Sequence, residues 1–202
     1  MRLGIYGGTF SPIHLGHVRA AEEFLEGFGL DKLLVIPTAL PPHKTEVAGA
    51  SAEDRLEMAR LAFTGHERVE VSDYEILRGG KSYSVLTLEH FKPGNELFML
   101  VGTDMFLTLD RWFRAEEIFR LTDIVLKRRE DDPDTAADIA SKTLGYTERF
   151  GARIHIMDDA AFPVSSTGLR ELIRDGKPTD GLLPDSVADY ISENNLYKEV
   201  AI

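Results

Sequence analysis

The stretch GGTFSPIHLGH, from Gly7 to His17, follows a short apolar run, Leu3–Tyr6, that is predicted to be the first β-strand. A helical pattern begins where the stretch ends, so its glycines lie at a strand-to-helix turn. Glycine lets backbone N–H groups approach an anion closely, and the start of a helix carries a partial positive charge. Because His14 and His17 add imidazole donors at the same place, the turn is expected to bind phosphate groups.

Two better-known phosphate-binding loops do not fit this turn. Its glycines, at positions 4, 7, 8 and 16, miss the G-x-G-x-x-G spacing, and no lysine follows the last of them as in a P-loop. Instead, Phe10 and Pro12 stand at fixed places among the glycines and histidines. A surface turn that merely carries two histidines would not need this whole pattern, so a chemical role is the better interpretation.

The composition is that of an ordinary globular protein. The 202 residues are 43% hydrophobic and 28% charged, enough for one domain with a full core. We expect a single domain over 1–202, in which 164–202 form a C-terminal helical extension. The net charge of −11 argues against nucleic acid as a partner.

Targeting signals and cysteines are missing from the sequence. No apolar run reaches the ~18 residues of a membrane span, and no signal region is visible, so no membrane association is expected. The chain has no cysteine, which excludes disulfides and favours a cytoplasmic location. Assembly into a homo-oligomer is left open.

Short apolar runs, many of them β-branched, alternate with helical patterns along most of the chain. Strands are expected at Leu3–Tyr6, Leu33–Ile36, Val69–Val71, Leu97–Val101, Ile124–Leu126 and Arg153–Ile156. Helices are expected near 18–28, 51–63, 85–91, 116–121, 135–150, 168–174 and after Pro184, with a charged loop over Glu130–Asp134. This alternation predicts an α/β fold with a doubly wound parallel sheet. Ligands of such sheets bind beyond the carboxyl ends of the strands.

Two more stretches place a cation where a nucleotide phosphate could lie. Pro41-Pro42-His43-Lys44 follows the second predicted strand, and the paired prolines present Lys44 from a stiff support. Farther along, Ser165-Ser166-Thr167 precedes a predicted helix that carries Arg170. Serines there are most often helix caps, but Arg170 is expected to point back over the first turn and, with the helix dipole, to clamp an anion.

Alternatives stay open for two features beyond the fourth predicted strand. Asp104, in Gly102-Thr103-Asp104, is equally suited to bind a ribose hydroxyl and to cap the next helix. Trp112 is the only tryptophan. A lone tryptophan is more often a core residue, yet this one lies in a loop-like stretch where a flat ring could stack on it.

Taken together, these motifs resemble those of bacterial nicotinate-nucleotide adenylyltransferases, which belong to the HxGH nucleotidyltransferase superfamily. The resemblance covers nearly the whole chain and rests on GGTFSPIHLGH, PPHK at 41–44, SYSVLTL at 82–88, GTD at 102–104 with Trp112, VSSTGLR at 164–170 and the ending LPDSVADYI. It implies transfer of AMP from ATP to nicotinate mononucleotide in NAD biosynthesis. It also implies Mg²⁺ as a cofactor, held by the ATP phosphates and water with no dedicated protein metal site.

The resemblance assigns roles to individual residues. Those implied to act in catalysis are His14, His17, Lys44 and Arg170. Those implied to bind ATP are Gly7, Gly8, Thr9, Phe10, His14, His17, Gly102, Asp104, Ser166, Thr167 and Arg170. Those implied to surround nicotinate mononucleotide are Lys44, Tyr83, Ser84 and Trp112. Two positions depart from the family pattern, since Ser11 stands where Asp is usual and Ser84 where Thr is usual.

Two other functions remain alternatives at this point. A binding module that senses a finished dinucleotide would also use a Rossmann-like sheet, although it would normally show the G-x-G-x-x-G turn. A related adenylyltransferase would act on phosphopantetheine or on nicotinamide mononucleotide. Release of pyrophosphate from ATP in the presence of each acceptor separates the three.

Overall fold

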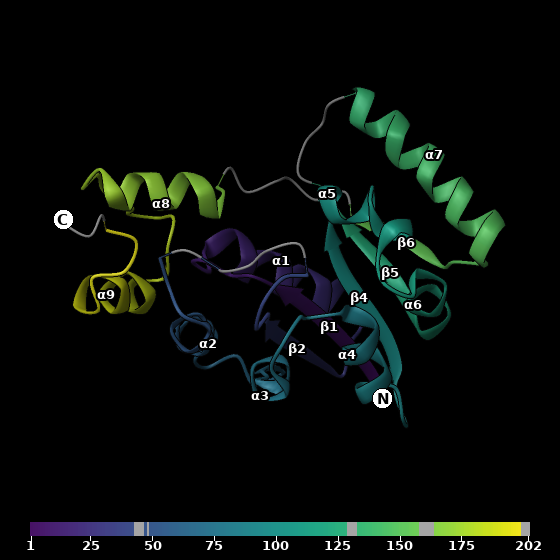
Figure 1. Ribbon diagram of the computed structural model, residues 1–202, viewed down its shortest axis with the longest axis horizontal. Helices are drawn as coiled ribbons and strands as arrows, with labels where there is room; N and C mark the ends of the chain where they lie inside the picture. The colour runs from purple at the N-terminus through teal and green to yellow at the C-terminus, as the bar shows by residue number, and fades with distance from the viewer. Residues whose placement is uncertain (43–46, 48, 129–132, 158–163, 199–202) are drawn as a thin grey trace. The chain divides into compact units, whose positions relative to one another are not determined.

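A computed structural model describes residues 1–42, 47, 49–128, 133–157 and 164–198 (Figure 1). Within these residues, six strands form one sheet in the order β3-β2-β1-β4-β5-β6, with helices on both sides. The pairs β1–β4, β4–β5 and β5–β6 are parallel, with Ile5 opposite Met99 and Ile124 opposite Ile154. The expected doubly wound parallel sheet is therefore confirmed. Its order reverses between β1 and β4, and ligands of such sheets bind beyond the carboxyl ends at this point.

The bounds of the elements follow the sequence patterns closely. The strands are β1 (Arg2–Gly8), β2 (Lys32–Pro37), β3 (Val69–Val71), β4 (Glu96–Gly102), β5 (Thr122–Lys127) and β6 (Ile154–Met157). The helices are α1 (Leu15–Gly27), α2 (Ala52–Ala62), α3 (Tyr74–Arg78), α4 (Ser84–Phe91), α5 (Thr103–Phe106), α6 (Ala115–Leu121), α7 (Pro133–Phe150), α8 (Ser166–Arg174) and α9 (Asp185–Glu193), with a 3₁₀ turn, η1 (Leu109–Arg111). All six expected strands form.

Some expectations about helices and loops are wrong in detail. The short helices α3 and α5 were not expected, because five and four residues are too few to show a periodic apolar pattern. The charged loop expected over Glu130–Asp134 overlaps α7, which begins at Pro133. Proline suits the first turn of a helix, where its missing N–H would have no partner.

The chain divides into two compact units. The first comprises Met1–Gly7, Glu23–Leu34 and Tyr83–Ala161, and the second comprises Gly8–Glu22, Val35–Ser82 and Phe162–Ile202. Helices α8 and α9 supply the expected C-terminal helical extension. A single domain over 1–202 stays a prediction.

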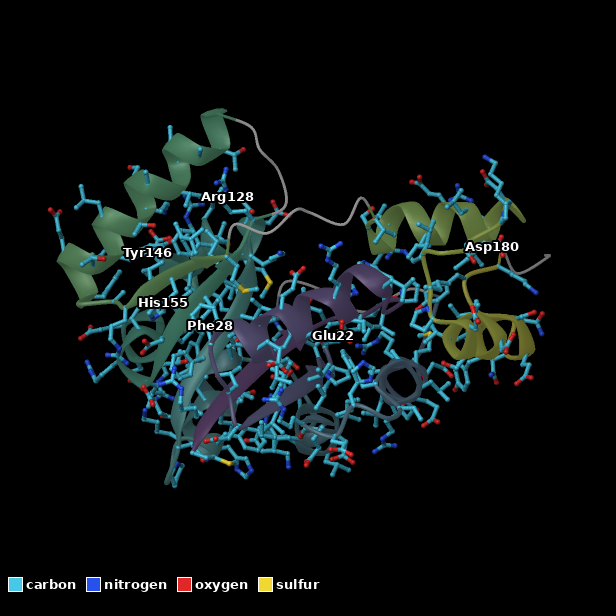
Figure 2. The ribbon with its side chains drawn as sticks, turned by 180° about the vertical axis from the view of Figure 1, so that it is seen from behind. Glu22, Phe28, Arg128, Tyr146, His155 and Asp180 are labelled. Atoms are coloured by element: carbon cyan, nitrogen blue, oxygen red, sulfur yellow. The ribbon has the colours of Figure 1, made fainter. Side chains whose placement is uncertain are left out.

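Two inner strands and a set of aromatic rings form the core of the first unit. The central residues of β4 and β5 are buried. Phe119 of α6 contacts both Tyr146 and Phe150 of α7, with ring centroids 4.9 Å away in each case. These rings pack helices α6 and α7 against each other. On β6, the strand next to β5, the ring of His155 meets that of Phe28 edge-on, with centroids 5.5 Å apart (Figure 2).

In the second unit, α2 packs against α9. Ser51 caps α2 and forms a capping box with Asp54. The hydroxyl of Tyr190 on α9 donates to Asp54 Oδ1 at 3.0 Å, so the cap also connects the two helices. In the described part of the chain, no helix has both the length and the apolar character needed to cross a membrane.

Candidate functional site

The turn after β1 is built around Phe10. Its side chain is buried, its φ is 46°, and a Cβ added at Gly8 would lie 2.8 Å from its ring. A larger residue at position 8 would clash with the ring of Phe10, so close packing by itself accounts for Gly8. The ring of Phe10 meets that of His17 edge-on, with centroids 5.1 Å apart. The side chain of Phe10 supports an imidazole, so a contact with ATP would come from its backbone. The Ser11–Pro12 peptide in this turn is cis.

The two histidines lie together at the start of α1. Their rings stack with centroids 3.6 Å apart. The backbone N–H of His14 donates a hydrogen bond to Nδ1 of the His17 ring at 3.3 Å. Because Nδ1 of His17 accepts a hydrogen bond, the proton of the neutral ring lies on Nε2. His17 therefore offers an N–H donor through Nε2, which suits a developing negative charge on phosphate.

The start of α8 contacts the turn that carries these histidines. Arg170 Nη1 donates to Ser11 O at 2.7 Å and Nη2 to Thr167 Oγ1 at 3.1 Å, so Arg170 does point back over the first turn of α8. The hydroxyl of Ser166 donates to Pro12 O at 3.0 Å. Ser165 is the N-cap, and its hydroxyl accepts from the N–H of Gly168 at 3.1 Å. Two motifs more than 150 residues apart in sequence, at Ser11 and Arg170, thus form one cluster.

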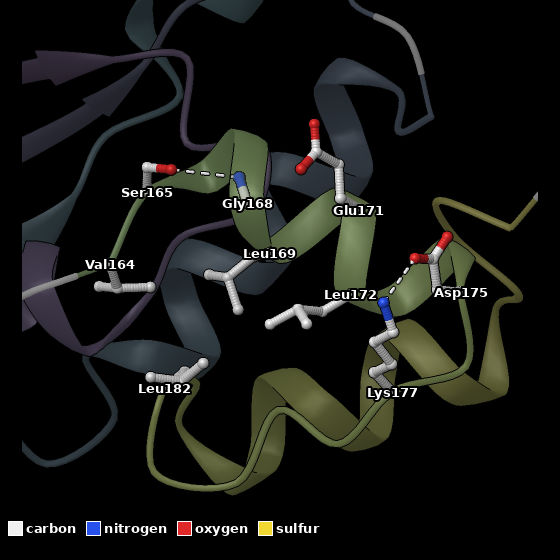
Figure 3. A pocket seen from close by; sticks show the side chains of 9 residues that line it. All are labelled: Val164, Ser165, Gly168, Leu169, Glu171, Leu172, Asp175, Lys177 and Leu182. Atoms are coloured by element: carbon white, nitrogen blue, oxygen red, sulfur yellow. Dashed lines mark hydrogen bonds and ion pairs between the residues drawn. The ribbon is translucent and has the colours of Figure 1, made fainter.

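A pocket of about 390 Å³ opens beside α8 (Figure 3). Its lining combines the N-cap region, an apolar floor and a charged rim, and consists of Val164, Ser165, Gly168, Leu169, Glu171, Leu172, Asp175, Lys177 and Leu182. Lys177 and Asp175 pair at the rim, 3.0 Å apart. Leu182 O accepts from the N–H of Leu15, the first residue of α1, at 3.0 Å. The pocket therefore borders the cluster that holds both motifs.

Three of the expected binders of nicotinate mononucleotide, Tyr83, Ser84 and Trp112, belong to the first unit. Tyr83 is the N-cap of α4, and Ser84 is the first residue of that helix. Trp112 is half-buried just after η1. Its neighbour Phe113 is 52% exposed, and its ring lies 4.7 Å from that of Tyr83. Sequence reasoning gave Phe113 no role, although an exposed aromatic beside Trp112 could have indicated one.

Asp104 lies in the first turn of α5 and does not cap it. The N-cap is Gly102, with no side-chain hydrogen bond, and the Asp104 side chain is exposed. Of the two roles left open for Asp104, capping is therefore wrong. Lys44 lies outside the described residues. Among the residues that are described, no three His, Cys, Asp or Glu side chains group in a way that could hold a metal ion.

Sequence reasoning also missed Arg55, whose side chain is almost fully buried under the turn after β1. Its Nη1 donates to Thr9 O at 2.8 Å. A signal was present, because Arg55 shares helical spacing with the buried residues Met58, Ala59 and Ala62. A charged residue on the apolar face of a helix is a candidate for a specific buried contact.

Comparison with known proteins identifies the family. A family profile described as cytidylyltransferase-like matches residues 5–172. A probable nicotinate-nucleotide adenylyltransferase from Desulfatibacillum aliphaticivorans is 42% identical over 98% of this chain and 100% of its own length. Another, from Synechococcus sp. (strain JA-3-3Ab), is 39% identical over 97% of this chain and 94% of its own length.

Solved structures agree on the fold. Plasmodium falciparum nicotinic acid mononucleotide adenylyltransferase complexed with NaAD matches with a TM-score of 0.69, covering 97% of both chains at 15% identity. That likeness concerns the fold, whereas the sequence matches are close and nearly full-length. The chain belongs to the nicotinate-nucleotide adenylyltransferase family.

Proposed function

We propose that this chain transfers AMP from ATP to nicotinate mononucleotide, giving nicotinate adenine dinucleotide and pyrophosphate. The observation that carries the proposal is the cluster in which Ser166 and Arg170 of α8 hold the turn that bears the histidines. Two helix starts, two imidazoles and a guanidinium all favour negative charge, which suits a triphosphate. The names of the close relatives supply the acceptor.

Residue roles are part of the same proposal. We assign ATP to residues of the glycine-rich turn, the end of β4 and the start of α8, namely Gly7, Gly8, Thr9, Phe10, His14, His17, Gly102, Asp104, Ser166, Thr167 and Arg170. We assign nicotinate mononucleotide to Lys44, Tyr83, Ser84 and Trp112. His14, His17, Lys44 and Arg170 would stabilise the phosphoryl group during transfer.

The reaction needs neither a general base nor a covalent intermediate. The 5′-phosphate of the mononucleotide is mostly dianionic at pH 7, because the second pKa of a phosphate monoester is about 6. One of its oxygens attacks the α-phosphorus of ATP and forms a P–O bond. The bond from that phosphorus to the bridging oxygen breaks, and pyrophosphate leaves with the electron pair. The protein must bring two polyanions together and stabilise the α-phosphoryl oxygens, and Nε2–H of His17 is suited to this.

Mg²⁺, bound through the ATP phosphates, would neutralise charge on the leaving pyrophosphate. We propose that phosphate oxygens and water supply its ligands, because Mg²⁺ in nucleotide-using enzymes usually keeps several waters. A cytoplasmic location belongs to this proposal as well, since a chain without cysteine suits a reducing compartment.

A panel of phosphate acceptors tests the proposal. Purified protein is mixed with ATP, Mg²⁺ and either nicotinate mononucleotide, nicotinamide mononucleotide or phosphopantetheine, and pyrophosphate release is measured. We expect the highest kcat/KM with nicotinate mononucleotide. Turnover with another acceptor alone would reassign the substrate, and binding of the dinucleotide without any turnover would favour a sensor.

A further inference from the structure

A buried arginine joins the loops that follow β1 and β2. Arg55 of α2 is only 1% exposed. Its guanidinium donates to Thr9 O at 2.8 Å and to Ala39 O at 3.1 Å. Burial lowers the pKa of Arg55, yet a guanidinium stays charged at neutral pH. A buried charge is costly, so one that is directed at two loop carbonyls calls for a role beyond packing.

Tyr197, which follows α9, connects the same two loops a second time. Its hydroxyl lies 3.2 Å from Ser11 Oγ, and its N–H donates to Gly49 O at 3.2 Å. The side chain is buried, and φ is 61°, a conformation that bulky residues rarely adopt. Such a conformation persists only where the surroundings hold it in place. Burial also raises the pKa of Tyr197 to about 12, so the hydroxyl remains a hydrogen-bond donor at neutral pH.

Together the two residues hold both ends of the loop after β2, Arg55 through its side chain and Tyr197 through its backbone N–H. Arg55 contacts Ala39, soon after β2 ends, and Tyr197 contacts Gly49, shortly before α2 begins. Lys44 lies between these two points in the sequence. Each side chain also contacts the turn after β1, Arg55 at Thr9 and Tyr197 at Ser11.

These contacts also determine how the turn presents its backbone. In a trans peptide, the C=O and the N–H point in opposite directions. Because Thr9 O points to Arg55, the N–H of Phe10 points away from α2. Donors outside the turn hold the carbonyls of Ser11 and Pro12 as well. Holding the Thr9 carbonyl in this way fixes the direction of the N–H of Phe10 within the turn.

We propose that Arg55 and Tyr197 form a clamp that positions the turn with His14 and His17 and fixes the loop after β2 at Ala39 and Gly49. Both are positioning residues, because they act through the loops rather than on substrate. The identity of the substrates rests on the proposed function, whereas the stiffening of the turn does not.

The first test removes one hydroxyl. Tyr197→Phe is expected to lower kcat/KM for ATP by roughly 3- to 10-fold, the scale of one hydrogen bond. Ser11→Ala is expected to do the same, and the double variant to be no worse than the poorer single variant. Tyr190→Phe is the matched control, because its hydroxyl belongs to the same extension but bonds to Asp54. It is expected to stay within about twofold of wild type.

The second test displaces Tyr197 without changing it. Gly49 and Gly65 both have φ of 85°, but a Cβ on Gly49 would lie 2.6 Å from the ring of Tyr197, whereas one on Gly65 would meet nothing within 4 Å. Both alanine variants therefore place a Cβ on a residue with the same positive φ. Only Gly49→Ala is expected to lower kcat/KM for ATP, again by roughly 3-fold or more.

A readout that does not need activity separates the clamp from the proposed function. Hydrogen exchange of the peptide covering 9–17 is expected to be faster in Tyr197→Phe and Gly49→Ala than in Tyr190→Phe and Gly65→Ala. If wild type releases no pyrophosphate, the proposed function fails, and this exchange still decides the clamp. Equal exchange and equal kcat/KM between the test variants and their controls would overturn the clamp, even in an active enzyme.

Discussion

At His17, the neighbouring groups determine which nitrogen can act on a phosphate. Nδ1 of His17 accepts a hydrogen bond from the backbone N–H of His14 at 3.3 Å. The single N–H proton of the neutral His17 ring therefore lies on Nε2. The stacked ring of His14 and the edge of Phe10 restrict how the imidazole can turn. A donor that is already oriented costs little reorganisation when charge develops, which is the condition for strong electrostatic catalysis.

His17→Ala should therefore lower kcat by roughly 10²–10³, the scale seen when a donor to the transition state is removed. The fold should survive, because the imidazole is only half-buried. Steady-state kinetics with ATP and nicotinate mononucleotide measures the effect, and a thermal melt checks folding. His90→Ala, which removes an exposed imidazole on α4, is the control. A loss under fivefold would show that His17 does not act at the reacting phosphate.

Asp110, just before Trp112, carries a pH-dependent part of the stability. Its carboxylate accepts from Lys142 Nζ at 3.0 Å and from the Tyr146 hydroxyl at 3.2 Å. Burial alone raises the pKa of Asp110, but the hydrogen bonds and the charge of Lys142 outweigh it and leave the pKa below its usual value. A carboxyl with a lowered folded pKa stabilises the fold above its unfolded pKa, about 3.9, and this stabilisation is lost as pH falls through the folded pKa.

Asp110→Asn is accordingly expected to lower the free energy of unfolding at pH 7, with a deficit relative to wild type that shrinks below about pH 4. Urea denaturation of wild type and variant at pH 7 and at a pH below about 4 measures this deficit. Asp180→Asn, which changes an exposed aspartate, provides the comparison. A deficit of the same size at both pH values would show that ionisation of Asp110 is not responsible.

At the scale of elements, the N-terminal ends of helices α8 and α2 were the most predictable features. Ser165 and Ser51 cap these helices with side-chain hydrogen bonds, as their sequence positions indicate. Strand positions were predicted equally well, because short buried runs between helical patterns leave few other interpretations. Helices α3 and α5 were not predicted, since each is shorter than two turns and depends on what precedes it. Helix α5, for example, starts directly where β4 ends.

The cap of α8 should affect both stability and ATP use. Ser165→Ala is expected to destabilise the protein by about 1 kcal/mol, because the N–H of Gly168 loses its partner. The first turn of α8 would loosen, and with it the hold of Ser166 and Arg170 on the turn after β1, so KM for ATP should rise severalfold. Ser165→Thr keeps the hydroxyl and should restore both values. If the threonine variant is as impaired as the alanine variant, the cap is not the cause.

At the scale of the whole molecule, the class of sheet followed from the alternation of patterns, but the long-range contacts did not. Nothing in the sequence indicates that Tyr197 meets Ser11, 186 positions away, or that Arg55 meets Thr9. Such contacts depend on how α2 and α9 pack, which local propensity does not specify. The motif residues could be identified because their chemistry requires particular side chains. Supporting residues such as Phe113 and Tyr197 are harder to identify, because many residue types can fill a supporting position.

The choice between an acid and an amide substrate concerns the activity of the whole molecule. The N-cap of α4, Tyr83, makes no side-chain cap hydrogen bond, so the backbone N–H groups at this helix start are suited to a carboxylate. A carboxylate only accepts hydrogen bonds, whereas a carboxamide would turn an NH₂ donor toward these N–H groups. One group left unpaired costs roughly 1–3 kcal/mol.

We therefore expect kcat/KM for nicotinate mononucleotide to be at least about tenfold higher than kcat/KM for nicotinamide mononucleotide. A tenfold difference corresponds to about 1.4 kcal/mol. Trp112→Ala provides an internal comparison. If the indole stacks on the pyridine ring, which both substrates share, the variant should lose kcat/KM for both by a similar factor and keep their ratio. Equal values for the two mononucleotides in wild type, or a preference for the amide, would rule out a carboxylate site at the start of α4 and leave adenylyl transfer itself intact.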